Sequence, residues 1–111
     1  MFVKSNIFKL KKIGEIIKTL REQQSLLLRQ VAAEIEIDQA LLSKIERGER
    51  MPTREQIKRF AKFFGREENE LLIAFLSDKL VYELKDEEVA FKVMQVAERK
   101  INYLIKTKNG K

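Results

Sequence analysis

The chain contains no cysteine and no histidine. The first absence excludes disulfides, thiolate metal ligands and thiol nucleophiles. The second removes the commonest general base and the commonest metal ligand. Carboxylate pairs remain, at Glu67, Glu68 and Glu70 and at Glu87 and Glu88, but these stand at predicted helix starts, where the helix dipole alone accounts for acidic residues. We therefore expect a protein that is not an enzyme and needs no metal or cofactor.

Proline occurs once and glycine four times among 111 residues, which favours long helices and few turns. No segment alternates apolar and polar residues between turn dipeptides, which argues against strands. No apolar run approaches the roughly 18 residues of a membrane span, and no charged leader precedes a short apolar segment. The sequence predicts an all-α, cytoplasmic protein without a membrane partner.

Basic residues outnumber acidic ones by 23 to 17, which gives a net charge of +6. The excess lies in residues 1–65, with 14 basic and 8 acidic side chains, and in residues 99–111, with 5 basic and none acidic. Residues 66–98 carry 4 basic and 9 acidic side chains. A basic half-molecule favours nucleic acid over a membrane surface as partner, although a solubilising lysine-rich surface accounts for the charge equally well.

Apolar residues spaced by three and four positions predict six helices. The predicted helices cover about residues 8–24, 28–36, 39–47, 53–64, 71–84 and 86–106. Leu10 and Ile17 are expected on the buried face of the first helix. Asp38 and Asp86 are predicted N-caps, and Thr53 with Gln56 fits a capping box.

Two short helices joined by a tight turn in the basic half favour a helix-turn-helix. More specific marks are Arg21, the pair Val31-Ala32, the run LSKIERG at residues 42–48, and Pro52. An apolar pattern follows at Ile57, Phe60, Ala61 and Phe64. With these marks in register, residues 13–72 resemble the five-helix DNA-binding domain of phage repressors and Cro, the Xre-type helix-turn-helix family.

The resemblance implies an all-α fold, in which a five-helix repressor-like helix-turn-helix domain is followed by an additional C-terminal helix. It also implies that Gln39, Ala40, Leu41 and Lys44 face the bases of the major groove. Glutamine can bond adenine, lysine can donate to guanine, and an apolar side chain can touch a thymine methyl. The competing interpretation is that Gln39 and Lys44 are solvated helix residues.

Phosphate contacts are expected around this third helix. The candidates are Arg29, Gln30, Ser43, Arg47, Arg50, Thr53 and Arg54. The start of the fourth helix, at Thr53 and Arg54, also offers backbone amides to a phosphate. For each candidate charge, a solvated surface position is the alternative.

The resemblance further implies that Arg21 pairs with Glu46, so that the first helix holds the end of the third. Two departures from the family pattern stand out. Leu27 and Leu28 occupy the place of a polar cap followed by glutamine. Glu36 stands where the family favours glycine, so the turn after the second helix either avoids a positive φ or is strained.

Residues 73–111 are too few for a ligand-sensing domain with its own core. The last predicted helix is apolar over a wide face, so it packs back on the first and fifth helices or, in addition, on a second copy. We expect a DNA-binding domain over residues 1–72 and a dimerising extension over 73–111. The predicted function is a repressor or autoregulator that binds inverted-repeat DNA as a homodimer. The alternative is an antitoxin or a restriction-modification controller, in which residues 66–98 hold a protein partner.

Overall fold

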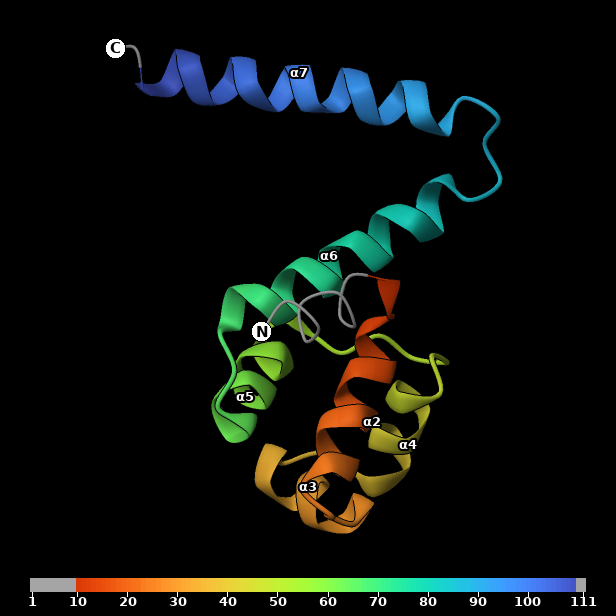
Figure 1. Ribbon diagram of the computed structural model, residues 1–111, viewed down its shortest axis with the longest axis vertical. Helices are drawn as coiled ribbons and strands as arrows, with labels where there is room; N and C mark the ends of the chain where they lie inside the picture. Colours follow the sequence, from red (N-terminus) through yellow and green to blue (C-terminus); the bar gives the residue numbers. More distant parts are fainter. Residues whose placement is uncertain (1–9, 110–111) are drawn as a thin grey trace. The chain divides into compact units, whose positions relative to one another are not determined.

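The computed structural model describes residues 10–109, which form six α-helices and no strand (Figure 1). The helices are α2 (Ile13–Gln23), α3 (Leu28–Ile35), α4 (Gln39–Glu46), α5 (Arg54–Phe64), α6 (Glu68–Leu84) and α7 (Ala90–Asn109). The predicted fold class, all-α with a helix beyond the helix-turn-helix, is confirmed.

The described chain divides into two compact units, residues 10–79 and residues 80–109, with the boundary inside α6. All of its buried side chains belong to the first unit. The second unit consists of the end of α6, a turn and α7. The predicted functional division after residue 72 stays a prediction.

The core of the first unit is formed by apolar residues from all five of its helices. Its fully buried large side chains are Ile16, Ile17, Val31, Ile35, Leu42, Ile45, Ile57, Phe60 and Leu71. Each such burial contributes about 1.5–3 kcal/mol relative to an exposed side chain. In Figure 1, α2 and α4 lie side by side, and residues of these two helices are in contact.

Gly14 permits the close approach of α2 and α4. A Cβ atom added to Gly14 would lie 2.0 Å from the carbonyl oxygen of Ile45, which is a backbone atom of α4. Real Cβ atoms essentially never come within 3.0 Å of another heavy atom. The sequence shows this glycine, but nothing in its immediate neighbourhood indicates the contact.

Asp78 joins α6 to the beginning of α2. Its Oδ2 atom accepts a hydrogen bond of 2.8 Å from the backbone N–H of Ile13, one of the amides at the start of α2 that have no partner within the helix. Partial burial raises the pKa of Asp78, and this hydrogen bond opposes the rise. The sequence analysis did not identify this cap.

The turn between α3 and α4 contains a strained residue. Glu36 has φ of 66°, in the left-handed region. The turn therefore keeps a positive φ, although glutamate stands where the family favours glycine. This conformation costs a residue other than glycine roughly 1–2 kcal/mol. Arg59 of α5 stabilises the turn, because its Nη1 donates to the carbonyl oxygen of Ile35 at 3.0 Å and lies 3.6 Å from the Glu36 carboxylate.

Two local signals at helix ends are confirmed. The amide N–H of Gln56 donates to Thr53 Oγ1 at 3.1 Å, and the amide N–H of Thr53 donates to Gln56 Oε1 at 2.9 Å, which forms the predicted capping box at α5. Gly48 has φ of 80° at the end of α4, as predicted for a left-handed helix terminus.

The first predicted helix was placed too early. Helix α2 begins at Ile13, after Lys12 at the N-cap. Leu10 is 94% exposed and lies before this helix, so its predicted place on the buried face was wrong. Residues 8 and 9 of the predicted helix lie outside the described residues.

Of two further expectations for helix starts, one is confirmed and one was wrong. Asp38 stands at the N-cap of α4, as predicted, although its side chain makes no capping hydrogen bond. Helix α7 begins at Ala90, so Asp86 does not cap it. The Glu87 N–H donates to the Leu84 carbonyl oxygen at 2.9 Å, and this turn moves the start of α7 along the chain.

Candidate nucleic-acid interface

Helix α4 presents one polar arc and buries the opposite one. Successive residues of a helix are rotated by about 100° around its axis. Measured from Gln39, the polar arc covers about 140° of the circumference of α4. Along it, in order of angle, lie Gln39, Ser43, Arg47, Ala40 and Lys44. The opposite arc consists of Leu41, Ile45, Leu42 and Glu46, of which the last three are buried. The buried arc fixes the rotation of α4, so the polar arc faces outward.

Three of the four residues predicted to face bases are exposed on this arc: Gln39, Ala40 and Lys44. Leu41 lies on the other side, partly buried against the core. Gln39 and Lys44 are at the two edges of the exposed arc, separated by about 7.5 Å of rise along the helix axis. The arc therefore combines an amide, a methyl group and an ammonium group within reach of successive positions along a groove.

An ion pair holds the end of α4 to α2. Arg21 Nε donates to Glu46 Oε2 at 2.7 Å, and Arg21 Nη2 donates to Glu46 Oε1 at 2.9 Å. Arg21 Nη1 also donates to the carbonyl oxygen of Leu26 at 2.9 Å. The Glu46 side chain is only 5% exposed, and its hydrogen bonds to Arg21 raise the pKa of that guanidinium. This forked contact fixes the position of α4 without using any atom of the polar arc.

Replacing Glu46 by alanine is expected to lower the free energy of unfolding by about 1–3 kcal/mol. The reason is that the partly buried guanidinium of Arg21 loses both of its carboxylate acceptors. Thermal unfolding of the variant measures the loss, and DNA selection by the folded variant shows whether its base preference is retained. An unchanged melting temperature would contradict a stabilising role for the pair.

The start of α3 is arranged differently from the family pattern. Leu27 stands at the N-cap, and its amide N–H donates to Gln30 Oε1 at 2.7 Å. The Gln30 amide oxygen is therefore engaged within the protein, which leaves the NH₂ group as its free donor. Arg29, beside it, is exposed.

The start of α5 adds two further candidates. Arg54 is the first residue of α5 and is exposed, beside the N-terminal amides of the helix. The Thr53 side chain accepts a hydrogen bond from Gln56 as the N-cap, and its hydroxyl hydrogen remains able to donate. Arg50 is exposed in the loop between α4 and α5. A cationic side chain and a helix N-terminus thus occur at the same place.

Arg47 and Ser43 differ from the other phosphate candidates because they contact each other. Arg47 Nη1 donates to Ser43 Oγ. The same guanidinium forms a forked contact with Glu49, with Nε to Oε2 at 2.8 Å and Nη2 to Oε1 at 3.2 Å. The sequence analysis did not single out Glu49, although an acidic residue two positions after an arginine at a helix end was the available signal.

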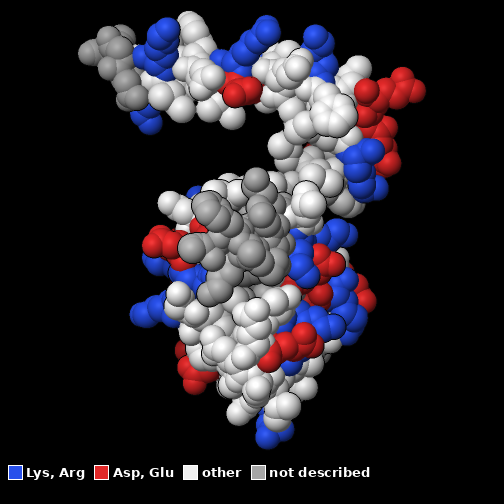
Figure 2. Space-filling view, viewed as in Figure 1, with Lys and Arg blue, Asp and Glu red and all other residues white. Residues whose placement is uncertain are grey.

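Charges of both signs are intermixed over the face of the first unit shown in Figure 2. The exposed acidic residue Glu36 and the arginine Arg59 of this unit are neighbours in an ion pair. Some of the basic residues of this unit are therefore paired with acidic neighbours. The cations that can reach DNA must therefore be identified one by one.

Helix α7 in the second unit has an apolar stripe in which no residue is fully buried. Its residues follow one another at intervals of four, three, four and three positions. They are Ala90, Met94, Ala97, Ile101 and Leu104. Ile101 is 55% exposed and Leu104 is 64% exposed. Lys92, Arg99 and Lys106, spaced by seven, lie on the opposite side of the helix.

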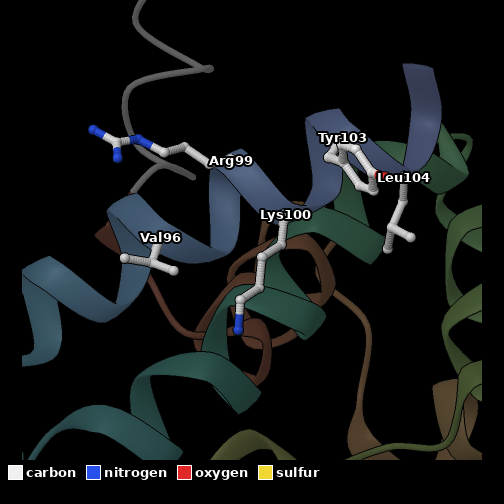
Figure 3. A pocket seen from close by; sticks show the side chains of 5 residues that line it. All are labelled: Val96, Arg99, Lys100, Tyr103 and Leu104. Atoms are coloured by element: carbon white, nitrogen blue, oxygen red, sulfur yellow. The ribbon is translucent and has the colours of Figure 1, made fainter. Parts of the chain in front are cut away.

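One open depression is lined by residues of α7 alone: Val96, Arg99, Lys100, Tyr103 and Leu104 (Figure 3). Because one helix supplies all of its lining, the depression does not enclose a small molecule. Over residues 10–109, no group of three or more acidic residues is placed to hold a metal ion. None of the described helices has the length and apolar character needed to cross a membrane.

Comparison with protein families shows that residues 17–71 match a family described as helix-turn-helix. The match extends from the middle of α2 into α6 and contains the Arg21–Glu46 pair and all of α4. Comparisons with curated proteins and with solved structures gave no significant match. Helix-turn-helix domains of this kind are DNA-binding regulatory domains rather than enzymes. The chain belongs to the Xre-type helix-turn-helix family of DNA-binding regulators.

Proposed function

We propose that the protein is a repressor or autoregulator that binds inverted-repeat DNA as a homodimer and inserts α4 into the major groove. The observation that carries this proposal is the division of α4 into a buried and an exposed arc. Leu42 and Ile45 anchor the helix, while Gln39, Ala40 and Lys44 are exposed together. A helix held in this way can enter a groove as a rigid body.

The chemistry of the exposed arc determines the proposed base contacts. The Gln39 amide can donate to and accept from adenine, and the Lys44 ammonium can donate to O6 and N7 of guanine. Ala40 can contact a thymine methyl. Because Gln39 and Lys44 lie at opposite edges of the arc, each addresses a different base pair of one half-site.

Phosphate contacts are proposed on both sides of this helix. Arg29 and the NH₂ group of Gln30 precede it at the start of α3, and Arg50, Thr53 and Arg54 follow it. These contacts orient the domain on the duplex and carry no sequence information. If about six phosphates are neutralised per dimer, the logarithm of the affinity falls against the logarithm of salt concentration with a slope near −5.

The second copy is proposed to pack against the apolar stripe of α7. The stripe alternates intervals of three and four, with Ile101 and Leu104 in the positions that a two-stranded coiled coil fills with isoleucine and leucine. Pairing through this stripe keeps Lys92, Arg99 and Lys106 on the outer surfaces of both helices. Most of the stability of a helix in a protein comes from the packing of its apolar face, so a partner also stabilises the fold of α7.

The test compares Lys44→Ala with Arg54→Ala by selection from randomised DNA and by salt titration of affinity. Lys44→Ala is expected to cost about 1–3 kcal/mol on the selected operator and to relax preference at one base-pair position. Arg54→Ala is the matched control for a phosphate contact. It is expected to weaken all sequences similarly and to make the salt slope shallower by about one.

Two outcomes contradict the proposal. If Lys44→Ala keeps the consensus at every position and loses affinity uniformly, Lys44 contacts phosphate and α4 is not oriented as proposed. If the unsubstituted protein binds with no dependence on salt, the assignment of the basic residues to phosphates is wrong.

A further inference from the structure

The chain reverses after α4 in a way that fixes Glu49 beside this helix. Gly48 adopts φ of 80°, and its N–H donates to the carbonyl oxygen of Ile45 at 3.0 Å. The N–H of Glu49 donates to the carbonyl oxygen of Lys44 at 2.9 Å. The backbone of Glu49 is thus hydrogen-bonded to the last turn of α4, so its carboxylate stays close to the polar arc.

The Glu49 carboxylate occupies one edge of the Arg47 guanidinium. It accepts from Nε at 2.8 Å and from Nη2 at 3.2 Å, while Nη1 donates to Ser43 Oγ. Arg47 lies at about 80° on α4, in the middle of the polar arc between Gln39 and Lys44. Hydrogen bonds from Arg47 lower the pKa of the Glu49 carboxyl, and the charge of Lys44 adds to this effect.

The Arg47–Glu49 pair lowers the positive charge at the end of α4, the helix proposed to enter the groove. Affinity for DNA of any sequence comes essentially from cations that neutralise phosphates. A guanidinium and a carboxylate in a forked contact have no net charge as a pair, so the pair attracts phosphates less than the guanidinium alone would. Both side chains are 54% exposed, and exposed pairs of this kind add little to folding stability. The effect of this pair is therefore expected in DNA binding and not in the fold.

We propose that Glu49 lowers the affinity of the protein for DNA of any sequence by holding Arg47 and offsetting its charge. The inference rests on the proposed function and deepens it. Base contacts by Gln39 and Lys44 do not involve the Glu49 carboxylate, so the operator retains them. The phosphate contribution of Arg47 is reduced for the operator and for non-cognate DNA alike, because phosphate contacts carry no sequence information. A larger share of the operator affinity therefore comes from the base contacts.

The experiment uses Glu49→Gln in the full chain, because glutamine keeps the size of the side chain and removes its charge. Affinity is measured for the selected operator and for a random-sequence duplex at several salt concentrations. For the random duplex we expect, for each subunit, a rise of about three- to eightfold at 0.1 M salt and a slope steeper by about one. The affinity for the operator is expected to rise by a similar factor, so that the ratio of operator to random affinity stays nearly constant.

Two controls separate the mechanism from a general effect of charge. Glu83→Gln removes the same charge from an exposed position of the second unit and is expected to change affinity much less. In an Arg47→Ala background, Glu49→Gln is expected to have no larger effect than Glu83→Gln.

Three results would overturn the inference. An equal rise in the Arg47→Ala background means that the carboxylate acts without Arg47. A fall in affinity for both duplexes means that Glu49 orients Arg47 for a favourable contact. An unchanged affinity for the random duplex means that the pair opens on DNA without cost. Failure of the proposed function appears separately, since the unsubstituted protein then selects no operator.

Discussion

Replacing Gly14 by alanine is expected to destabilise the first unit by about 3 kcal/mol or more. The added Cβ would lie 2.0 Å from the Ile45 carbonyl oxygen, a backbone atom that cannot turn aside as a flexible side chain can. Helices α2 and α4 must therefore separate, which opens the core between them. For a domain of this size the melting temperature should fall by at least roughly 12 °C.

Gly65→Ala is the matched control for this experiment. Gly65 has φ of 67°, but a Cβ atom there meets nothing within 4 Å. Its replacement is expected to cost about 1–2 kcal/mol through backbone conformation alone. Similar melting temperatures for the two variants would show that α2 and α4 can move apart easily, contrary to the packing described above.

Introducing charge into the α7 stripe is expected to abolish the proposed dimer. In the double variant Ile101→Glu with Leu104→Glu, four carboxylates would meet where apolar side chains are proposed to pack. Loss of the second half-site should lower operator affinity at least about a hundredfold, because the link between two binding domains is worth this much or more. Sedimentation measures the oligomeric state, and operator binding measures the functional effect.

Tyr103→Glu is the control for this pair of substitutions. Tyr103 is also an exposed apolar residue of α7, but it lies about 140° from the centre of the stripe. Its replacement is expected to leave the dimer intact. If the unsubstituted protein is already monomeric at micromolar concentration, the stripe does not bind a second copy, and a different protein partner becomes the stronger candidate for this face.

Local chemistry made most of the fold predictable. In Thr53 and Gln56, the backbone N–H of each residue donates to the side-chain oxygen of the other. Gly48 ends α4 because glycine readily adopts a positive φ. Such signals need no knowledge of the rest of the molecule. Spacing of apolar residues likewise indicated which faces of α4 and α5 are buried.

The contacts that escaped prediction join distant parts of the chain. Asp78 caps a helix that begins 65 residues earlier, and the need for glycine at position 14 depends on where α4 passes. The forked contact of Glu49 with Arg47 is local, yet it depends on the chain reversal at Gly48, which turns an unremarkable acidic residue toward the helix. The roles of Asp78 and Gly14 cannot be identified from residue type before the helices are packed, whereas Glu49 follows an arginine at the end of a helix.

The absence of buried side chains in residues 80–108 has a consequence for how the protein responds to its own concentration. If α7 is completed only by a second copy, dimer concentration varies with the square of total protein concentration below the dissociation constant. Operator occupancy then rises quadratically, so a regulator that represses its own synthesis would respond to its level with a threshold. At low levels the uncovered helix would unfold more often and be cleaved by proteases, which would shorten the lifetime of monomers and sharpen the threshold further.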